Sequence, residues 1–216
     1  MARTRLPASR RAVARRRVVV RRGVAAFLVL AALVAVAVVV RRDPTLLPGE
    51  RPGTPAWARE HYGDPDGRRF KARHIVQIEF LGRAMFVHEK ATRHFLRLEA
   101  LFEARAPEYA AAVVAGELDD WSYLNRSVRG QKSTKSNHAF GLAVDVNALT
   151  NVLGTTGDMP DEVVRQWLIE GGEWGGHWSR RDPMHFETHL TPAQIRARYR
   201  ADGTPKDWYL AELVGG

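Results

Sequence analysis

Residues 136–147 read SNHAFGLAVDVN and place a histidine and an aspartate, seven residues apart, within an apolar stretch. Charged side chains are rarely buried unless they are paired or bind a metal. Alternation over residues 142–148 predicts a strand with Asp145 on its face of smaller side chains. Gly141 allows a turn that would bring His138 back over that face. The stretch therefore predicts either a structural His–Asp hydrogen bond or two metal ligands.

A second stretch, RRDPMHFE at residues 180–187, supplies a third candidate ligand, His185, and a carboxylate three residues before it, Asp182. Two histidines, one carboxylate and an open fourth position form a common catalytic zinc site. His189 follows His185 by four residues, about 13 Å along a strand, so the two cannot share one ion. We expect His189 at the surface or in support of the ligands. The chain has no cysteine, so a metal would need histidine and carboxylate ligands.

The N-terminal region differs in composition from the rest of the chain. Residues 1–22 contain nine arginines and no acidic residue, and residues 23–40 are uncharged and mostly apolar. As a helix, the apolar run would be about 27 Å long, close to the thickness of a bilayer's hydrocarbon core. The arginines on its N-terminal side predict a basic cytoplasmic tail, a single-pass anchor in the cell membrane and an extracytoplasmic C-terminal domain. A cleaved signal peptide with secretion, and an arginine-rich arm that binds nucleic acid, are the alternatives.

The net charge of +9 comes from this N-terminal region. The first 42 residues hold 11 of the 33 basic residues and none of the 24 acidic ones, which leaves 22 basic and 24 acidic residues in the remainder. A domain with this balance lacks the basic surface typical of nucleic-acid binding, so we expect no nucleic-acid partner. No sequence pattern predicts an oligomeric state.

The rest of the chain divides into a Pro/Gly-rich linker at residues 41–55 and a globular domain at residues 56–216. Apolar periodicity, glycines and prolines predict short helices and mostly antiparallel strands within the domain. This pattern predicts an α+β fold with a small antiparallel sheet and flanking helices. The predicted elements are a hairpin at 74–88, a helix at 89–105, a short helix or turn at 107–116, a strand at 142–148, a helix at 161–170, a strand at 184–190 and a helix at 191–200.

SNHAFGLAVDVN resembles the S-x-H-x-x-G-x-A-x-D signature of the zinc D-alanyl-D-alanine carboxypeptidases. Vancomycin-resistance carboxypeptidases and phage L-alanyl-D-glutamate endopeptidases are relatives of that group. EWGGHWSRRDPMHFE at residues 173–187 resembles its second signature, W-G-G-x-W followed by D-x-M-H-F-E. The likeness runs from about Gly82 to Tyr199 and implies the hedgehog/DD-peptidase fold.

The resemblance also implies roles for individual residues. His138, Asp145 and His185 would hold one zinc ion, and Asp182 stands where the family has its general base. The family uses an arginine upstream of the first signature to stabilise the oxyanion. Arg126 is the preferred candidate for this role, with Arg129 as the alternative.

By the same resemblance, the substrate would be the peptidoglycan stem peptide, cut by a zinc metallopeptidase in cell-wall turnover. Trp174 and Trp178 would wall the substrate pocket or, alternatively, belong to the core. The cleaved bond would be the terminal D-alanyl-D-alanine bond or the internal L-alanyl-D-glutamate bond. Two rival functions are a non-catalytic peptidoglycan-binding module and a membrane scaffold whose arginine tail holds an acidic cytoplasmic partner.

Overall fold

The computed structural model describes residues 51–116 and 121–215, which belong to one compact unit. The predicted basic tail and membrane anchor, and most of the predicted linker, lie outside these residues. Within the described ranges, no helix is both long and apolar enough to cross a bilayer.

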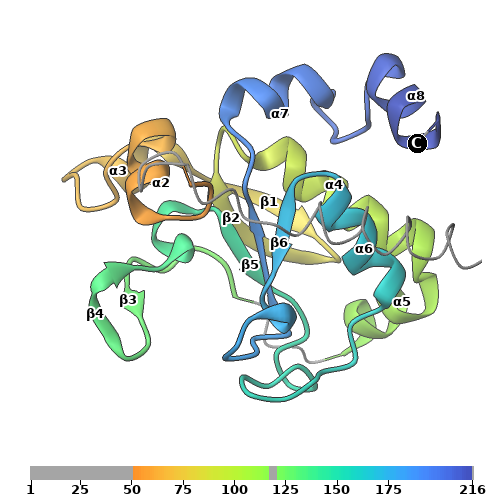
Figure 1. Ribbon diagram of the computed structural model, residues 1–216, viewed down its shortest axis with the longest axis horizontal. Helices are drawn as coiled ribbons and strands as arrows, with labels where there is room; N and C mark the ends of the chain where they lie inside the picture. Colours follow the sequence, from red (N-terminus) through yellow and green to blue (C-terminus); the bar gives the residue numbers. More distant parts are fainter. Residues whose placement is uncertain (1–50, 117–120, 216) are drawn as a thin grey trace, which may run out of the picture. The chain divides into compact units, whose positions relative to one another are not determined.

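Short helices and short antiparallel strands alternate along the described chain (Figure 1). This confirms the mixed α+β class, although the strands form three small sheets instead of the single one expected. The helices are α2 (Pro55–Tyr62), α3 (Phe70–His74), α4 (Thr92–Arg105), α5 (Pro107–Ala115), α6 (Asp161–Ile169), α7 (Pro192–Arg198) and α8 (Asp207–Gly215), with 3₁₀ turns η1 (Asn137–Phe140) and η2 (Gly175–His177). The strands are β1 (Ile75–Phe80), β2 (Arg83–His88), β3 (Ser127–Val128), β4 (Gln131–Lys135), β5 (Ala143–Asp145), β6 (Gly172–Trp174) and β7 (His185–Thr188).

The predicted hairpin and helices are confirmed with small shifts of their ends. Strands β1 and β2 pair antiparallel around a turn at Leu81–Gly82. Helix α4 buries Phe95, Leu98 and Phe102 at the spacing that predicted it. Helix α7 begins with a capping box, in which the Thr191 side chain accepts from the backbone of Gln194 while the Gln194 side chain accepts from the backbone of Thr191.

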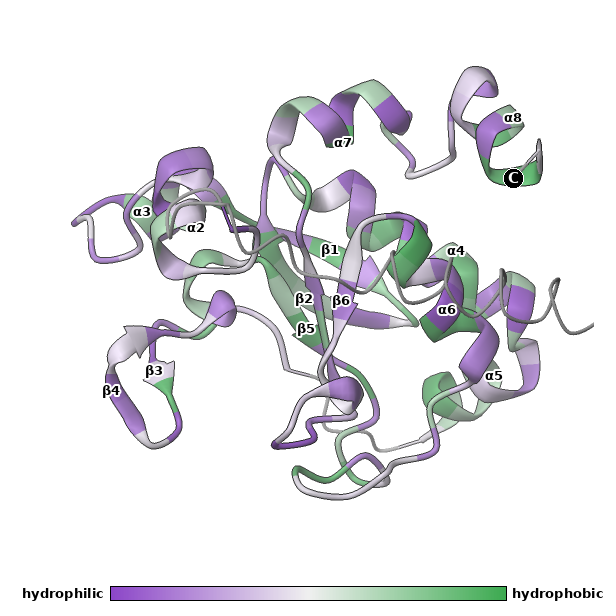
Figure 2. Cartoon of the chain, in the orientation of Figure 1, coloured by the Kyte–Doolittle hydropathy of each residue, from purple (hydrophilic) through white to green (hydrophobic). Residues whose placement is uncertain are grey.

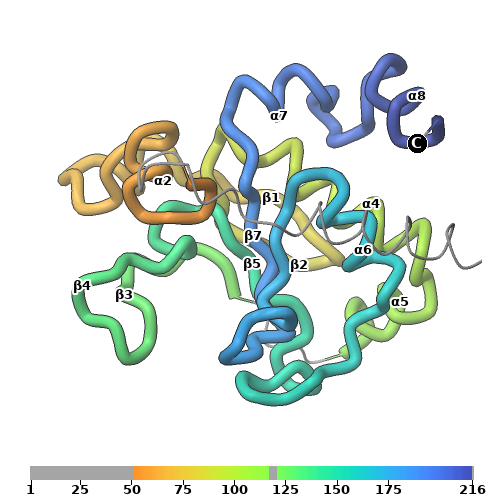
Figure 3. Tube along the Cα trace, in the orientation of Figure 1, coloured from red at the N-terminus to blue at the C-terminus, as the bar shows by residue number. Residues whose placement is uncertain are grey.

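The three-stranded sheet that carries the second and third candidate ligands has the order β5-β7-β6, with β7 in the middle (Figure 3). The predicted strand at 142–148 is shorter than expected, because it ends at Asp145 and Asn147 adopts a left-handed conformation with φ of 50°. Val144 and Phe186 face each other on the side of the sheet that packs into the hydrophobic core.

The hydrophobic core lies between the strands and helices α4, α5 and α6, and Figure 2 shows apolar residues concentrated on the central strands. The β3–β4 hairpin is largely polar in the same view, and its residues are half-buried or exposed. Helix α2 is held against the sheet region by Tyr62, whose hydroxyl donates a 2.5 Å hydrogen bond to the Leu190 carbonyl. It begins at Pro55, the last residue of the predicted linker, and Thr54 caps its N-terminus.

Candidate metal centre

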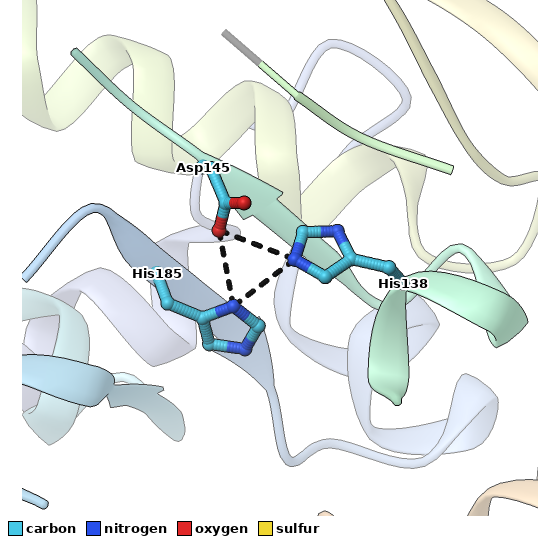
Figure 4. A group of neighbouring side chains, drawn as sticks. All are labelled: His138, Asp145 and His185. Atoms are coloured by element: carbon cyan, nitrogen blue, oxygen red, sulfur yellow. Dashed lines mark hydrogen bonds and ion pairs between the residues drawn. The ribbon is translucent and has the colours of Figure 1, made fainter. Parts of the chain in front are cut away.

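His138, Asp145 and His185 converge on one point (Figure 4). His138 Nε2, Asp145 Oδ1 and His185 Nδ1 form a triangle in which each pair of atoms is 3.1 Å apart. All three side chains are buried. The structure therefore brings together the three residues that the sequence predicted as metal ligands.

Strand pairing and a tight turn explain the positions of these three side chains. Asp145 on β5 and His185 on β7 are direct cross-strand partners, so their side chains emerge side by side on the sheet face away from the core. His138 lies on η1, which ends at Gly141 with φ of 68°. A Cβ at Gly141 would also collide with the backbone of His88, so only glycine fits this turn. The turn expected at Gly141 is confirmed.

Hydrogen bonds on the outer side of each imidazole fix which nitrogen carries a proton. His138 Nδ1 lies 2.7 Å from the Ser122 carbonyl oxygen, and His185 Nε2 lies 2.9 Å from Glu187 Oε2. Because a carbonyl and a carboxylate only accept, these outer nitrogens donate. The lone pairs of the inner nitrogens then point toward each other and toward Asp145, which is how metal-binding histidines are normally oriented.

The electrostatic environment of this cluster favours positive charge. Burial opposes a charged His185, but hydrogen bonds to Asp145 and Glu187 outweigh that cost and raise its pKa to about 10. Burial would also raise the pKa of Asp145, yet the neighbouring imidazoles hold it well below its usual range. A metal cation at the inner nitrogens would benefit from the same carboxylates and would displace the proton.

The donor set fits zinc. Donor atoms held at zinc–ligand distances of about 2.0–2.2 Å in a tetrahedral site lie about 3.3–3.6 Å from one another. The separations here are 3.1 Å, slightly shorter than that range. Two imidazoles and one carboxylate are also a ligand set that leaves a fourth position for catalysis. We conclude that the residues are suited to bind one divalent ion of this kind.

A pocket of about 350 Å³ is lined by Asp145 and His185, and Asp182 lies in its wall. Asp182 Oδ1 is buried and has no hydrogen-bond partner within the described residues. Burial raises the pKa of the Asp182 carboxyl, against the opposing charge of His185. An unpaired carboxylate with a raised pKa beside a metal site has the properties of a general base.

Gly175 explains why the W-G-G stretch accompanies this carboxylate. Its carbonyl accepts the Asp182 amide at 2.9 Å. A Cβ at Gly175 would overlap the carbonyl oxygen of Asp182 and would lie 3.1 Å from the Cβ of His185. The close approach of these three residues therefore requires glycine at position 175.

Both candidate arginines line the pocket, but they differ in their surroundings. Arg126 is half-buried, and its charge acts on Asp182, where it opposes the rise in pKa. Arg129 is exposed at the turn of the β3–β4 hairpin, and its carbonyl accepts a 3.1 Å hydrogen bond from Arg180. Of the two, Arg126 is the less exposed, and its charge acts on the candidate base.

The two tryptophans have different locations. Trp178 lines the pocket, its ring centroid lies 5.0 Å from that of His185, and its Nε1 donates to Glu173 at 3.0 Å. Trp174 does not line the pocket. It is opposite Phe186 on the apolar face of the sheet, and its Nε1 donates to the Pro183 carbonyl at 2.8 Å. Trp174 is therefore a core residue, as the alternative interpretation expected.

Sequence reasoning assigned no role to Glu187, which is central to the arrangement. This buried carboxylate accepts hydrogen bonds from His185 Nε2 at 2.9 Å, His189 Nε2 at 2.7 Å and Asn137 Nδ2 at 2.8 Å. The sequence did contain a signal for this role. Glu187 follows His185 by two residues on a predicted strand, and residues two apart on a strand share a face. His189 lies outside the candidate ligand group and supports it through Glu187.

Comparison with known proteins gave one match. Residues 129–188 match the family described as D-alanyl-D-alanine carboxypeptidase. Neither the curated proteins nor the solved structures contain a match to the chain. The matched segment includes the three converging residues and Asp182, whereas Arg126 precedes it. The resemblance to the D-alanyl-D-alanine carboxypeptidase family is thus confirmed over residues 129–188, the segment that builds the candidate metal centre.

Proposed function

We propose that this protein is a zinc-dependent peptidase that hydrolyses a peptide bond in the peptidoglycan stem peptide. The observation that carries the proposal is the triangle of His138, Asp145 and His185 donor atoms beside the unpaired carboxylate of Asp182. The family match over the same residues supports both the reaction type and the substrate class. Other divalent ions would suit the same ligands, so zinc itself is part of the proposal.

A zinc ion at these three donor atoms would act as a Lewis acid that activates water and polarises the scissile carbonyl. The Asp182 carboxylate would accept the proton of the attacking water. The Arg126 guanidinium would stabilise the negative charge that develops on the carbonyl oxygen. When the C–N bond breaks, Asp182 would return its proton to the departing amine. The elevated pKa of Asp182 suits both halves of this exchange.

The character of the pocket agrees with a stem-peptide substrate. Stem peptides carry free carboxylates, and the cationic side chains of Arg126, Arg129 and Arg180 line the pocket. Val128, Leu153 and Met184 supply apolar surface to the pocket. These features suit an anionic peptide, whether the cut is at the D-alanyl-D-alanine bond or at the L-alanyl-D-glutamate bond.

The proposal includes a location. Residues 23–40 would anchor the chain in the cell membrane and hold the peptidase domain on the outer side, where peptidoglycan lies. Such an anchor would limit the reach of a hydrolase that is dangerous to its own cell. Cleavage after the apolar run, with secretion of the domain, is the alternative.

The test is digestion of defined muropeptides by the full chain, purified in detergent and loaded with zinc, with mass spectrometry as the readout. Loss of one terminal alanine would identify a D,D-carboxypeptidase. Cleavage after L-alanine would identify an endopeptidase. Unchanged muropeptides, with zinc confirmed on the protein, would contradict the peptidase proposal and favour a non-catalytic binding module.

A further inference from the structure

The turn that precedes α2 lies directly on the residues that support the candidate metal centre. Arg51 and Thr54 close this turn, because the Thr54 hydroxyl donates to the Arg51 carbonyl at 2.8 Å. The Thr54 side chain then caps α2 by accepting from the Trp57 amide at 3.3 Å. The turn is therefore built into the domain at the start of a helix whose Trp57 is buried in the core. Composition alone had assigned it to the linker.

A chain of hydrogen bonds joins this turn to the metal centre. The Asn137 side-chain nitrogen Nδ2 donates to the Gly53 carbonyl at 3.0 Å and to Glu187 Oε2 at 2.8 Å. Glu187 Oε2 also accepts from His185 Nε2 at 2.9 Å, which leaves His185 Nδ1 facing the other donor atoms. Two acceptors on one amide nitrogen fix the orientation of the Asn137 side chain.

Gly53 also lies very close to His189 and Glu187, which support the candidate ligands. Its φ is 79°, and a Cβ there would collide with the His189 ring and lie 3.0 Å from Glu187 Oε1. The His189 ring lies among Glu187, Glu173 and Trp57, and 22% of its side chain is exposed. Its Nε2 donates to Glu187 at 2.7 Å, its Nδ1 lies 4.0 Å from Glu173, and the Trp57 ring packs against it at a centroid distance of 6.5 Å.

We propose that the turn Arg51–Thr54 is a positioning element of the metal centre, in which Gly53 acts through Asn137 and Glu187 to hold the His185 imidazole in its ligating orientation. The inference rests on the proposed metal site and adds a residue that lies 132 positions before His185 and outside the family match. Gly53 is a positioning residue, because its atoms contact the support of the ligands and not the ligands' donor atoms.

The test compares Gly53→Ala with Gly63→Ala in the full chain, purified in detergent. Gly63 is a matched control, because it also has a positive φ, 97°, but a Cβ there meets only the Phe70 ring at an ordinary 3.6 Å. Zinc affinity is measured by competition with a chelating dye. The imidazole nitrogen resonances of His185 and His189 are recorded by NMR on the zinc-free, histidine-labelled protein. Circular dichroism checks that both variants fold.

Outer hydrogen-bond partners of metal-ligating histidines typically contribute about 10–100-fold to metal affinity. We expect Gly53→Ala to weaken zinc binding about tenfold and to shift both histidine resonances, while Gly63→Ala changes neither. Asn137→Ala should also weaken zinc binding, because it removes the hydrogen bonds from Asn137 to the Gly53 carbonyl and to Glu187. Zinc binding by Gly53→Ala as tight as by Gly63→Ala would overturn the inference.

The NMR measurement separates this inference from the proposed function. If the unmodified chain binds no zinc, the proposed function fails, and the resonances decide the role of Gly53 independently. A shift of the His185 and His189 signals in Gly53→Ala alone would support the positioning role. Unchanged signals would overturn it.

Discussion

Nε2 of His138 lies 3.1 Å from Nδ1 of His185, and both nitrogens are the same distance from Asp145 Oδ1. Hydrogen bonds to Ser122 and Glu187 occupy the outer nitrogens of the two rings, so two lone pairs face each other across a carboxylate oxygen. Such an arrangement is stable only when a positive charge lies between these atoms. A proton on His185 supplies that charge in the metal-free protein, and the geometry suits a divalent ion in its place.

Asp182→Asn should reduce turnover of muropeptides by at least about 100-fold, because general bases contribute roughly 10²–10⁴-fold. Zinc content should stay the same, since Asp182 is not one of the three converging residues. Steady-state kinetics and elemental analysis of the same sample check both statements. Turnover close to that of the unmodified protein would rule out Asp182 as the base.

Arg126→Ala should lower kcat by about 10²–10³-fold, the usual effect of removing one oxyanion-stabilising donor. Arg129→Ala should change kcat much less, because Arg129 is exposed at the hairpin turn, whereas the charge of the half-buried Arg126 acts on Asp182. Parallel kinetics of the two variants on one muropeptide distinguish them. The reverse order of effects would reassign the role to Arg129.

Arg97→Met should strongly destabilise the fold. Arg97 makes a bidentate contact with the fully buried Glu170 carboxylate, with Nη2–Oε1 and Nε–Oε2 distances of 2.7 and 2.9 Å. Removal of one partner from a buried ion pair costs about 3–5 kcal/mol, because it leaves a buried charge without a counter-charge.

Arg200→Met is the matched control, since the Arg200–Asp207 pair is exposed and worth about 0–1 kcal/mol. Urea denaturation measures both free energies of unfolding. Similar losses in the two variants would contradict the importance of the buried pair.

His88 should make the fold sensitive to acid. Its Nε2 donates to the Tyr62 carbonyl at 3.0 Å and its Nδ1 accepts the Lys90 amide at 3.1 Å, so the ring is neutral. Burial lowers its pKa to about 4, against about 6.5 in the unfolded chain. Between these two pKa values, the unfolded state binds more protons at His88 than the folded state does. The contribution of His88 to stability is therefore full above about pH 7 and falls as the pH drops toward 4.

The expected loss from His88 between pH 7 and pH 5 is about 2 kcal/mol. Urea denaturation of the chelator-treated protein at the two pH values measures it, with His88→Gln as the comparison. His88→Gln should be less stable at pH 7 but should lose about 2 kcal/mol less between the two pH values. Equal losses in both proteins would show that His88 is not the sensitive group.

The sequence predicted the elements whose signals are local. Apolar spacing located α4, the β1–β2 hairpin was indicated by alternation around Gly82, and Thr191 with Pro192 marked the start of α7. Short strands without such signals were missed. Strand β6 follows Gly171 with only three residues, and β3 has two, so neither has enough length for a period of two to show.

The site was predicted as far as its residues lie within motifs. His138, Asp145 and His185 were candidates because of motif spacing, strand alternation and the turn at Gly141, and the structure places their donor atoms beside one another. Gly53 could not be found in this way, because its contact with Asn137 joins positions 84 residues apart and depends on tertiary packing. For Trp174, the motif gave a misleading indication. Its motif suggested a pocket wall, but the register with Phe186 turns its side chain into the core.

Elemental analysis of the full chain, with and without the substitution His185→Ala, tests the central claim most directly. After exposure to zinc and removal of free metal, the unmodified chain should retain one zinc ion per molecule, and His185→Ala should retain none. Zinc bound equally by both proteins, or by neither, would contradict a metal centre formed by His138, Asp145 and His185.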